Sequence, residues 1–206
     1  MTRTTMHRPE ATRRSTRVEL RPPTDKLTAV PYSTPDDPDR RFIDLRAHPE
    51  QVELIGELDG RPAMREQIML LNARSSPFFS IGCERSVSRL RRQDGSPVWK
   101  TTSYVQFAFI EPGRCEVANY VPLARTLHEA LEGKADSEEW NRLVELEPDP
   151  IVLQPAGRRA WSMTIWTTAY ALDGETSVHE WSLCMLAQTA AMAQWIRLGS
   201  LDATDI

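Results

Sequence analysis

The sequence lacks long apolar runs, paired cysteines and an apolar leader. No stretch approaches the ~20 apolar residues of a membrane-spanning helix, and no apolar core follows Met1, which argues against a secretory signal. The three cysteines, Cys83, Cys115 and Cys184, are widely spaced and form neither a CxxC pair nor a disulfide framework. We therefore expect a cytoplasmic protein without a membrane anchor, whose thiols are free and mostly buried.

The common motifs of catalysis and cofactor binding are also missing. The chain has no GxGxxG, no GxxxxGK[ST], no GxSxG and no Cys/His spacing typical of metal sites. His179-Glu180 begins like the HExxH motif of metalloproteases, but Leu183 occupies the position of the second histidine. The sequence thus predicts no cofactor, no metal and no catalytic residue.

What the chain does have is an uneven distribution of charge. Its 206 residues are 40% hydrophobic and 26% charged, as in an ordinary soluble protein with one core, and the net charge is −4. Residues 1–26 hold seven Arg/Lys against three Asp/Glu, a net +4 that leaves −8 for the remainder. Prolines also crowd the first 40 residues. We therefore predict an unstructured basic arm (1–40), a single α+β domain (41–199) and a flexible tail (200–206). Removing the arm should leave the melting temperature nearly unchanged.

Two adjacent residue patterns near the C-terminus predict a strand and a long helix, around which the rest of the chain is expected to pack. Residues 160–172 are rich in β-branched and aromatic side chains on both faces, which indicates a central strand. After a turn at Asp173-Gly174, Ser177 and Glu180 fit a capping box, followed by an apolar helical face to Leu198 and a C-terminal Gly199. A less favoured alternative makes residues 177–186 a second strand.

Shorter patterns predict the other elements. We expect helices at 63–73 and around Leu123–Leu131, and a hairpin of 79–88 with 99–109 that exposes one face. We also expect short strands at 115–120 and 151–153, a helix at 137–146 and a rigid break at 147–150. The fold class is α+β with a mostly antiparallel sheet. From Ala63 the order is helix, three strands, helix, two strands and a long C-terminal helix.

This order resembles that of the type III secretion chaperones and the related YbjN-like proteins. The resemblance covers about residues 63–198. It includes the turn Leu172-Asp173-Gly174 before the last helix and the pattern Ala191-Met192-Ala193-Gln194-Trp195 near that helix's end. The resemblance implies a small acidic homodimer that binds an extended segment of a partner protein and performs no catalysis. The arm and the predicted helix at 137–146 depart from the family pattern.

Aromatic residues near the C-terminus suggest where a partner binds. Six tryptophans are many for this length, and a sheet apolar on two faces has predicted helices for only one. The leading hypothesis is therefore a non-enzymatic protein-binding module. The candidate partner-binding residues are Trp161, Trp166, Tyr170, Trp181 and Trp195.

Two alternatives remain open. Arginines of the arm and of one hairpin end could contact nucleic-acid phosphates, although a charged hairpin tip that blocks aggregation is the favoured interpretation of the second group. These arginines are Arg3, Arg8, Arg13, Arg14, Arg17, Arg21, Arg89, Arg91 and Arg92. The weaker alternative is an enzyme in which Cys83 pairs with His128 or His179, against the commoner case of a structural cysteine.

Overall fold

The computed structural model describes residues 16–34, 37–132 and 141–201. The strands are β1 Thr16–Leu20, β2 Thr28–Val30, β3 Ser33–Thr34, β4 Asp37–Arg41, β5 Phe78–Arg91, β6 Pro97–Phe109, β7 Arg142–Leu153 and β8 Arg158–Ala171. The α-helices are α1 Pro62–Asn72, α2 Val117–Leu131 and α3 Gly174–Leu201. Three short 3₁₀ helices are η1 Pro49–Leu54, η2 Gly56–Leu58 and η3 Pro112–Arg114. No helix in these ranges is long and apolar enough to cross a bilayer.

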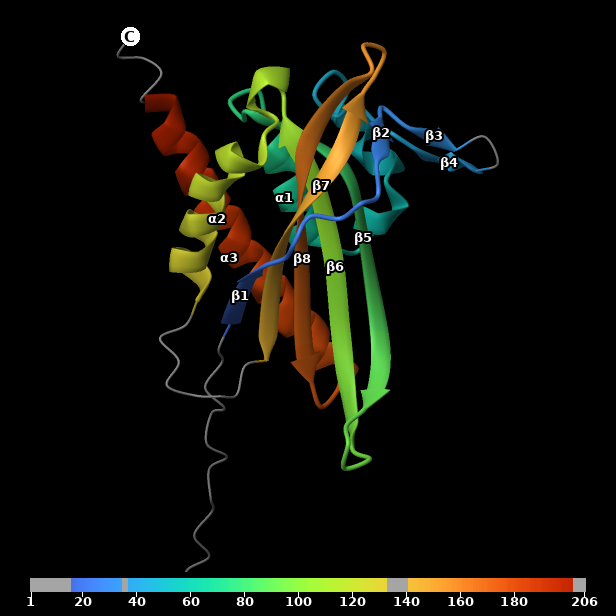
Figure 1. Ribbon diagram of the computed structural model, residues 1–206. Helices are drawn as coiled ribbons and strands as arrows, with labels where there is room; N and C mark the ends of the chain where they lie inside the picture. Colours follow the sequence, from blue (N-terminus) through green and yellow to red (C-terminus); the bar gives the residue numbers. More distant parts are fainter. Residues whose placement is uncertain (1–15, 35–36, 133–140, 202–206) are drawn as a thin grey trace, which may run out of the picture.

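A mixed, strongly curved sheet forms the centre of the fold (Figure 1). The strand order is β1-β7-β8-β6-β5, and β2 also pairs with β7. Strands β1 and β2 run parallel to β7, whereas β5, β6, β7 and β8 pair antiparallel. The α+β class is confirmed, but the sheet is mixed rather than mostly antiparallel. The order from α1 is helix, two strands, helix, two strands, helix.

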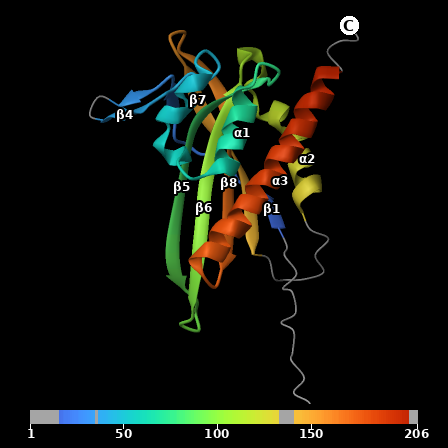
Figure 2. The same cartoon turned by 180° about the vertical axis from the view of Figure 1, so that it is seen from behind.

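The core lies between one face of the sheet and α3, which runs between α1 and α2 (Figure 2). Alternate residues of β6 and β8, such as Phe107 and Ile165, face this helix and are buried. Phe107 contacts Phe78 of β5 with ring centroids 5.0 Å apart. The predicted α1, the β5–β6 hairpin, the central position of β8 and the helical form of 177–186 are confirmed.

The predicted strand at 115–120 is wrong, because α2 already begins at Val117. Tyr120, Leu123 and Leu127 recur at spacings of three and four and are all buried, so the helical period decides the structure here. The alternating pattern of residues 115–120 was too short to specify a strand.

The predicted helix at 137–146 and the break at 147–150 are also wrong. Residues 142–153 form the single strand β7, while 137–140 lie outside the described residues. Its two prolines are compatible with a strand because of their orientation. The Pro148 carbonyl accepts a hydrogen bond from the Thr24 backbone N–H (3.3 Å), and Thr24 lies between β1 and β2. In a strand the backbone nitrogen and carbonyl of one residue point to the same side, so the Pro148 ring nitrogen faces away from β8. Pro150, two residues on, faces that side too, and neither proline removes a β7–β8 hydrogen bond.

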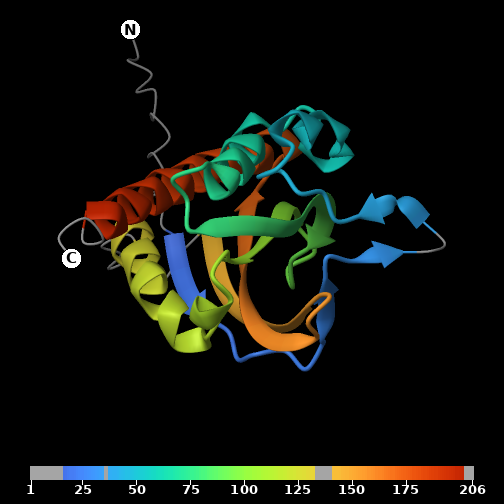
Figure 3. The ribbon, with the colours of Figure 1, turned by 90° about the horizontal axis from the view of Figure 1, so that it is seen from above.

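The prediction that the whole arm is unstructured needs correction for residues 16–34 and 37–40, which contain β1, β2, β3 and most of β4. β1 makes five residue pairs with β7 and β2 makes three, and Val30 is buried in the core. Two residues after β2, the Tyr32 hydroxyl donates to the Ile81 carbonyl of β5 (3.2 Å). The N-terminal segment therefore links β7 on one side of the sheet to β5 on the other, and Figure 3 shows how the sheet curves between them. Residues 1–15 lie outside the described part.

The start of α3 differs from the predicted capping box. Asp173 caps the helix: its carboxylate accepts from the backbone N–H of Thr176 (2.8 Å) and from its hydroxyl (2.7 Å). Ser177 lies inside the first turn, where its hydroxyl bonds to Thr101 (2.8 Å), and Glu180 pairs with Arg142. At the other end, α3 continues through Gly199, so this glycine is not a C-terminal cap.

This cap yields a pH-dependent prediction. The two bonds from Thr176, the backbone bond first, hold the pKa of Asp173 below its ordinary value. Its stabilising effect is therefore fully present above the unfolded-state pKa of about 3.9 and is lost as the pH falls through the lower folded-state pKa. We expect Asp173→Ala to lower the melting temperature at pH 7 and Asp173→Asn to retain most of it, because Asn also caps well. The difference between the natural chain and Asp173→Ala should shrink below about pH 4. A difference that stays constant down to pH 2 would contradict the assignment.

Candidate functional site

An apolar groove of about 270 Å³ lies between β1 and α2. These two elements run side by side at one edge of the sheet (Figures 1 and 3). Its lining residues are Val18, Glu19, Leu20, Val117, Tyr120, Val121, Ala124, Arg125, His128, Leu146, Pro148 and Met163. Leu20 is 66% exposed and Val121 is 45% exposed, so apolar side chains at the groove meet solvent.

Local sequence patterns build both walls of the groove. In β1, Val18 and Leu20 are two residues apart and pair in parallel register with Val144 and Leu146 of β7, which places all four on one face of the sheet. In α2, Val117, Val121 and Ala124 recur at spacings of four and three and share one face. The site could not be predicted from the sequence, because both patterns are short and 96 residues lie between the end of β1 at Leu20 and the start of α2 at Val117.

The outer side of β1 is the second feature of the site. Among the described strands, β1 pairs only with β7, so its other side presents backbone N–H and C=O groups that have no strand partner. An extended peptide can add to such an edge while its alternate side chains enter an adjacent apolar groove.

Charged residues surround the groove. Arg125 is exposed and forms no ion pair within the described ranges. His128 instead lies 2.5 Å from Glu132, and Glu19 lies 2.5 Å from Arg17. Arg125 is thus the cation at the rim that remains available for an acidic group.

The predicted aromatic residues do not come together on one surface. Trp181 is fully buried and donates from Nε1 to Ser103 (2.8 Å). Trp195 stacks on Phe78 with centroids 5.5 Å apart. Trp161 packs partly buried against the core. Trp166 and Tyr170 point to the sheet face opposite α3, where Trp166 contacts Tyr104 with centroids 5.2 Å apart.

The predicted phosphate-binding arginines are also separated. Arg3, Arg8, Arg13 and Arg14 lie outside the described residues. Arg17 pairs with Glu19, and Arg21 pairs with Glu145 (2.6 Å) and lies over the Trp166 ring (5.6 Å). Arg89, Arg91 and Arg92 are exposed near the tip of the β5–β6 hairpin. Arg17 and Arg21, the two of these arm arginines that the structure describes, thus pair with carboxylates of the same chain.

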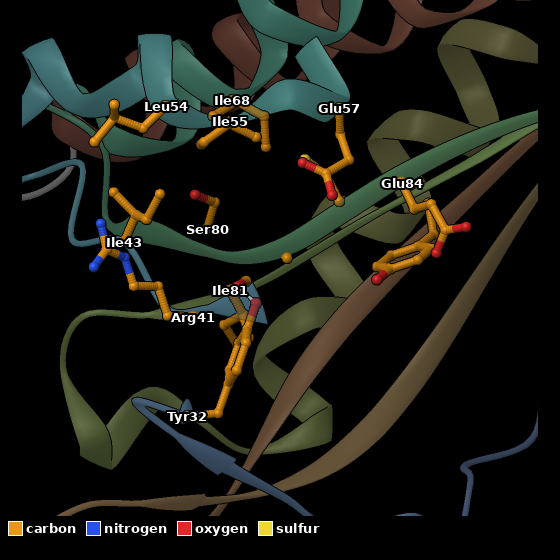
Figure 4. Close-up of a pocket in the computed structure, with 13 residues that line it drawn as sticks. Tyr32, Arg41, Ile43, Leu54, Ile55, Glu57, Ile68, Ser80, Ile81 and Glu84 are labelled. Carbon is orange, nitrogen blue, oxygen red and sulfur yellow. Dashed lines mark hydrogen bonds between the residues drawn. The ribbon is translucent and has the colours of Figure 1, made fainter. Parts of the chain in front are cut away.

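Cys83 lines a smaller cavity, of about 110 Å³, at the irregular part of β5 (Figure 4). Figure 4 places Arg41 on one side of this cavity and Glu57 and Glu84 on the other. The lining residues are Tyr32, Arg41, Ile43, Leu54, Ile55, Glu57, Ile68, Ser80, Ile81, Gly82, Cys83, Glu84 and Tyr104. Both positive and negative groups therefore surround a space too small for a nucleotide.

The cavity does not supply what a nucleophilic cysteine requires. Burial, and after it the negative charge of Glu57, raises the pKa of Cys83 to about 12, so the thiol stays protonated at neutral pH. Neither His128 nor His179 lines the cavity. Neither of the two histidines considered as the base in the enzyme hypothesis therefore lies in position to activate the thiol.

Comparisons with known proteins do not relate this chain to a known family or structure. No protein-family model matches the chain, and searches of curated proteins and of solved structures find no match. Among residues 16–34, 37–132 and 141–201, no three His, Cys, Asp or Glu side chains lie together in a way that could hold a metal ion.

Proposed function

We propose that this chain is a non-enzymatic protein-binding module that holds an extended apolar segment of another protein between β1 and α2. The observation that carries the proposal is the apolar groove of about 270 Å³ with the exposed Leu20 and Val121 at it. A contiguous apolar surface open to water is costly for a protein unless a partner covers it.

The shape of the site favours an extended segment over a small ligand. The groove is open along β1, whose outer backbone groups supply hydrogen bonds to a parallel or antiparallel peptide. Apolar side chains of the peptide would enter the groove at every second position. Arg125 at the rim selects segments that carry an acidic residue beside the apolar ones. The resemblance to the secretion chaperones expected from the sequence implies the same kind of partner, although two strands rather than the expected three follow α1.

The experiment selects peptides from a random display library on the immobilised full chain. We expect selected peptides to combine alternating apolar residues with one Asp or Glu. They should lose binding at least about tenfold to Leu20→Glu/Val121→Glu, because two carboxylates then enter an apolar groove. Both positions are exposed, so the variant should fold. Leu172→Glu is the matched control, since Leu172 is 72% exposed and lies outside the groove.

Two outcomes of the selection would contradict the proposal: selected peptides that bind the double variant as well as the natural chain, or no enriched peptide at all. The predicted homodimer remains a prediction, which sedimentation velocity of the purified chain tests. If the chain is a dimer and the double variant is a monomer, a second copy occupies the groove and the proposed partner is wrong.

A further inference from the structure

Charged side chains of both signs line the cavity at the irregular part of β5 without neutralising one another. Arg41 ends β4, Glu57 lies in η2 and Glu84 lies in β5. None of the three forms an ion pair with a charged group that the structure describes. Figure 4 shows the arginine on one side of the cavity and the two carboxylates on the other. A ligand that enters this space therefore meets positive charge on one side and negative charge on the other.

Arg61 belongs to the charges around this space, although it does not line the cavity. Burial, and after it the charge of Glu57, raises the pKa of Cys83. The charge of Arg61 opposes this rise, and that of Glu84 adds to it. A terminal nitrogen of Arg61 donates to the main-chain carbonyl of Glu57 rather than to its carboxylate. With Arg41, two positive and two negative charges balance, so a ligand without net charge preserves the balance.

The sheet side of the cavity carries two phenol hydroxyls. A Cβ atom at Gly82 would lie 3.6 Å from the Tyr32 hydroxyl and 3.8 Å from the Tyr104 hydroxyl, so both hydroxyls lie close to this glycine. Tyr32 donates to the Ile81 carbonyl (3.2 Å), where the register between β5 and β6 shifts. A hydroxyl that donates one hydrogen bond still has lone pairs that can accept another. The Tyr32 oxygen can therefore accept from a positively charged donor in the cavity.

The helix side of the cavity is apolar and limits the size of a ligand. Leu54, Ile55 and Ile68 lie on this side in Figure 4. The cavity has a volume of about 110 Å³. An apolar protein cavity of about 150 Å³ holds benzene, which has six heavy atoms. The cavity beside β5 therefore takes a ligand of about six heavy atoms or fewer, with an aliphatic part and two opposite charges.

We propose that this cavity binds a small amino acid in its zwitterionic form. The ligand's carboxylate accepts from the planar guanidinium of Arg41, and its ammonium group donates to the carboxylates of Glu57 and Glu84. A short aliphatic side chain packs on the apolar helix side. A simple anion or cation pairs with only one of the two charged sides. The cavity shares no lining residue with the groove between β1 and α2, so this site does not depend on the proposed function.

The test compares L-alanine with its two halves by isothermal titration calorimetry of the full chain, at pH 7 and constant ionic strength. Ethylamine is alanine without the carboxylate, and propionate is alanine without the ammonium group. We expect L-alanine to bind with a Kd of about 1 mM or lower. It should bind at least about tenfold more tightly than either half, because each half lacks one set of charge-assisted hydrogen bonds. At ten times its Kd, L-alanine should raise the melting temperature by about 3–6 °C.

Variants assign each charge of the ligand to its partner. Arg41→Gln should weaken the binding of L-alanine at least about tenfold and remove its advantage over ethylamine. Glu57→Gln/Glu84→Gln should remove its advantage over propionate. All three positions are exposed, so these variants should fold like the natural chain. Arg74→Gln and Glu53→Gln are the matched controls, since both side chains are exposed and lie outside the cavity, and they should bind L-alanine normally.

β-Alanine carries the same two charges one carbon further apart, and the prediction holds for it as well. The tighter of the two amino acids shows which charge separation the cavity accepts. The proposal is wrong if neither amino acid binds more tightly than ethylamine and propionate. It is also wrong if binding of the amino acid is unchanged in Arg41→Gln or in Glu57→Gln/Glu84→Gln.

Discussion

Deletion of residues 1–34 should lower the melting temperature by about 10 °C or more and broaden the unfolding transition. The deletion removes β1 and β2, which together cover most of one edge of β7, and it removes the buried Val30. It also removes Tyr32, whose hydroxyl bonds to β5 and whose ring contacts Phe42 with centroids 6.4 Å apart. Thermal unfolding followed by circular dichroism measures the effect.

The control deletion removes residues 1–15 and leaves β1 and β2 in place. We expect it to melt close to the full chain, because β1, β2, Val30 and Tyr32 all lie after residue 15 and stay in place. Val30→Ala supplies a smaller, graded version of the main result, with an expected loss of about 1–3 kcal/mol from the buried methyl groups. If the chain without residues 1–34 melts like the full chain, the parallel strands contribute nothing and the sheet is complete without them.

The second large effect concerns the ion pair of Glu180 with Arg142. The Glu180 side chain is 3% exposed and that of Arg142 is 14% exposed, and Nε of Arg142 lies 3.0 Å from the carboxylate. The pair joins α3 to the start of β7. Glu180→Ala should cost about 3–5 kcal/mol in the free energy of unfolding, because it leaves the mostly buried guanidinium charge without its partner. Denaturant titration at pH 7 measures this loss.

The double variant Glu180→Leu/Arg142→Met tests the cause of that loss. With both charges replaced by apolar groups of similar size, most of the stability should return. Glu53→Ala is the control for a more exposed pair, since the Glu53 side chain is 69% exposed and that of Arg65 is 39% exposed, and it should change stability little. A double variant as unstable as Glu180→Ala would show that shape or other contacts of Glu180, rather than the unpaired charge, cause the loss.

The sequence predicted best where a long periodic pattern and a turn signal coincide. Residues 78–109 alternate over two long strands with Asp94-Gly95 between them, and β8 and α3 carry patterns longer than ten residues. Prediction failed where short elements depend on distant partners. β1 has only Val18 and Leu20 as apolar residues, and proline-rich composition outweighed them. The prolines of β7 predicted a break in the strand, because the sequence does not show that they face the side of β7 on which β1 and β2 lie.

The candidate site was less predictable than the fold. Its walls come from β1 and α2, and one wall lay in a segment predicted to be unstructured. The tryptophans were predicted as the binding site instead, yet Trp181 is buried in the core and Trp195 packs partly buried against it. Glu180 was assigned to the helix cap because its partner Arg142 lies 38 positions earlier in the chain, in a strand that had been predicted as helix.

The parallel pairing of β1 and β2 with β7 also governs when this chain can fold during synthesis. Thr16 pairs with Arg142 and Val30 pairs with Leu153, so β1 and β2 leave the ribosome more than 100 residues before the strand with which they pair. Contacts of such long sequence separation slow folding, and strands that remain unpaired meanwhile are open to association with other chains. The net positive charge of residues 1–26 repels the same segment of another chain, which opposes pairing between copies while β1 and β2 have no partner strand.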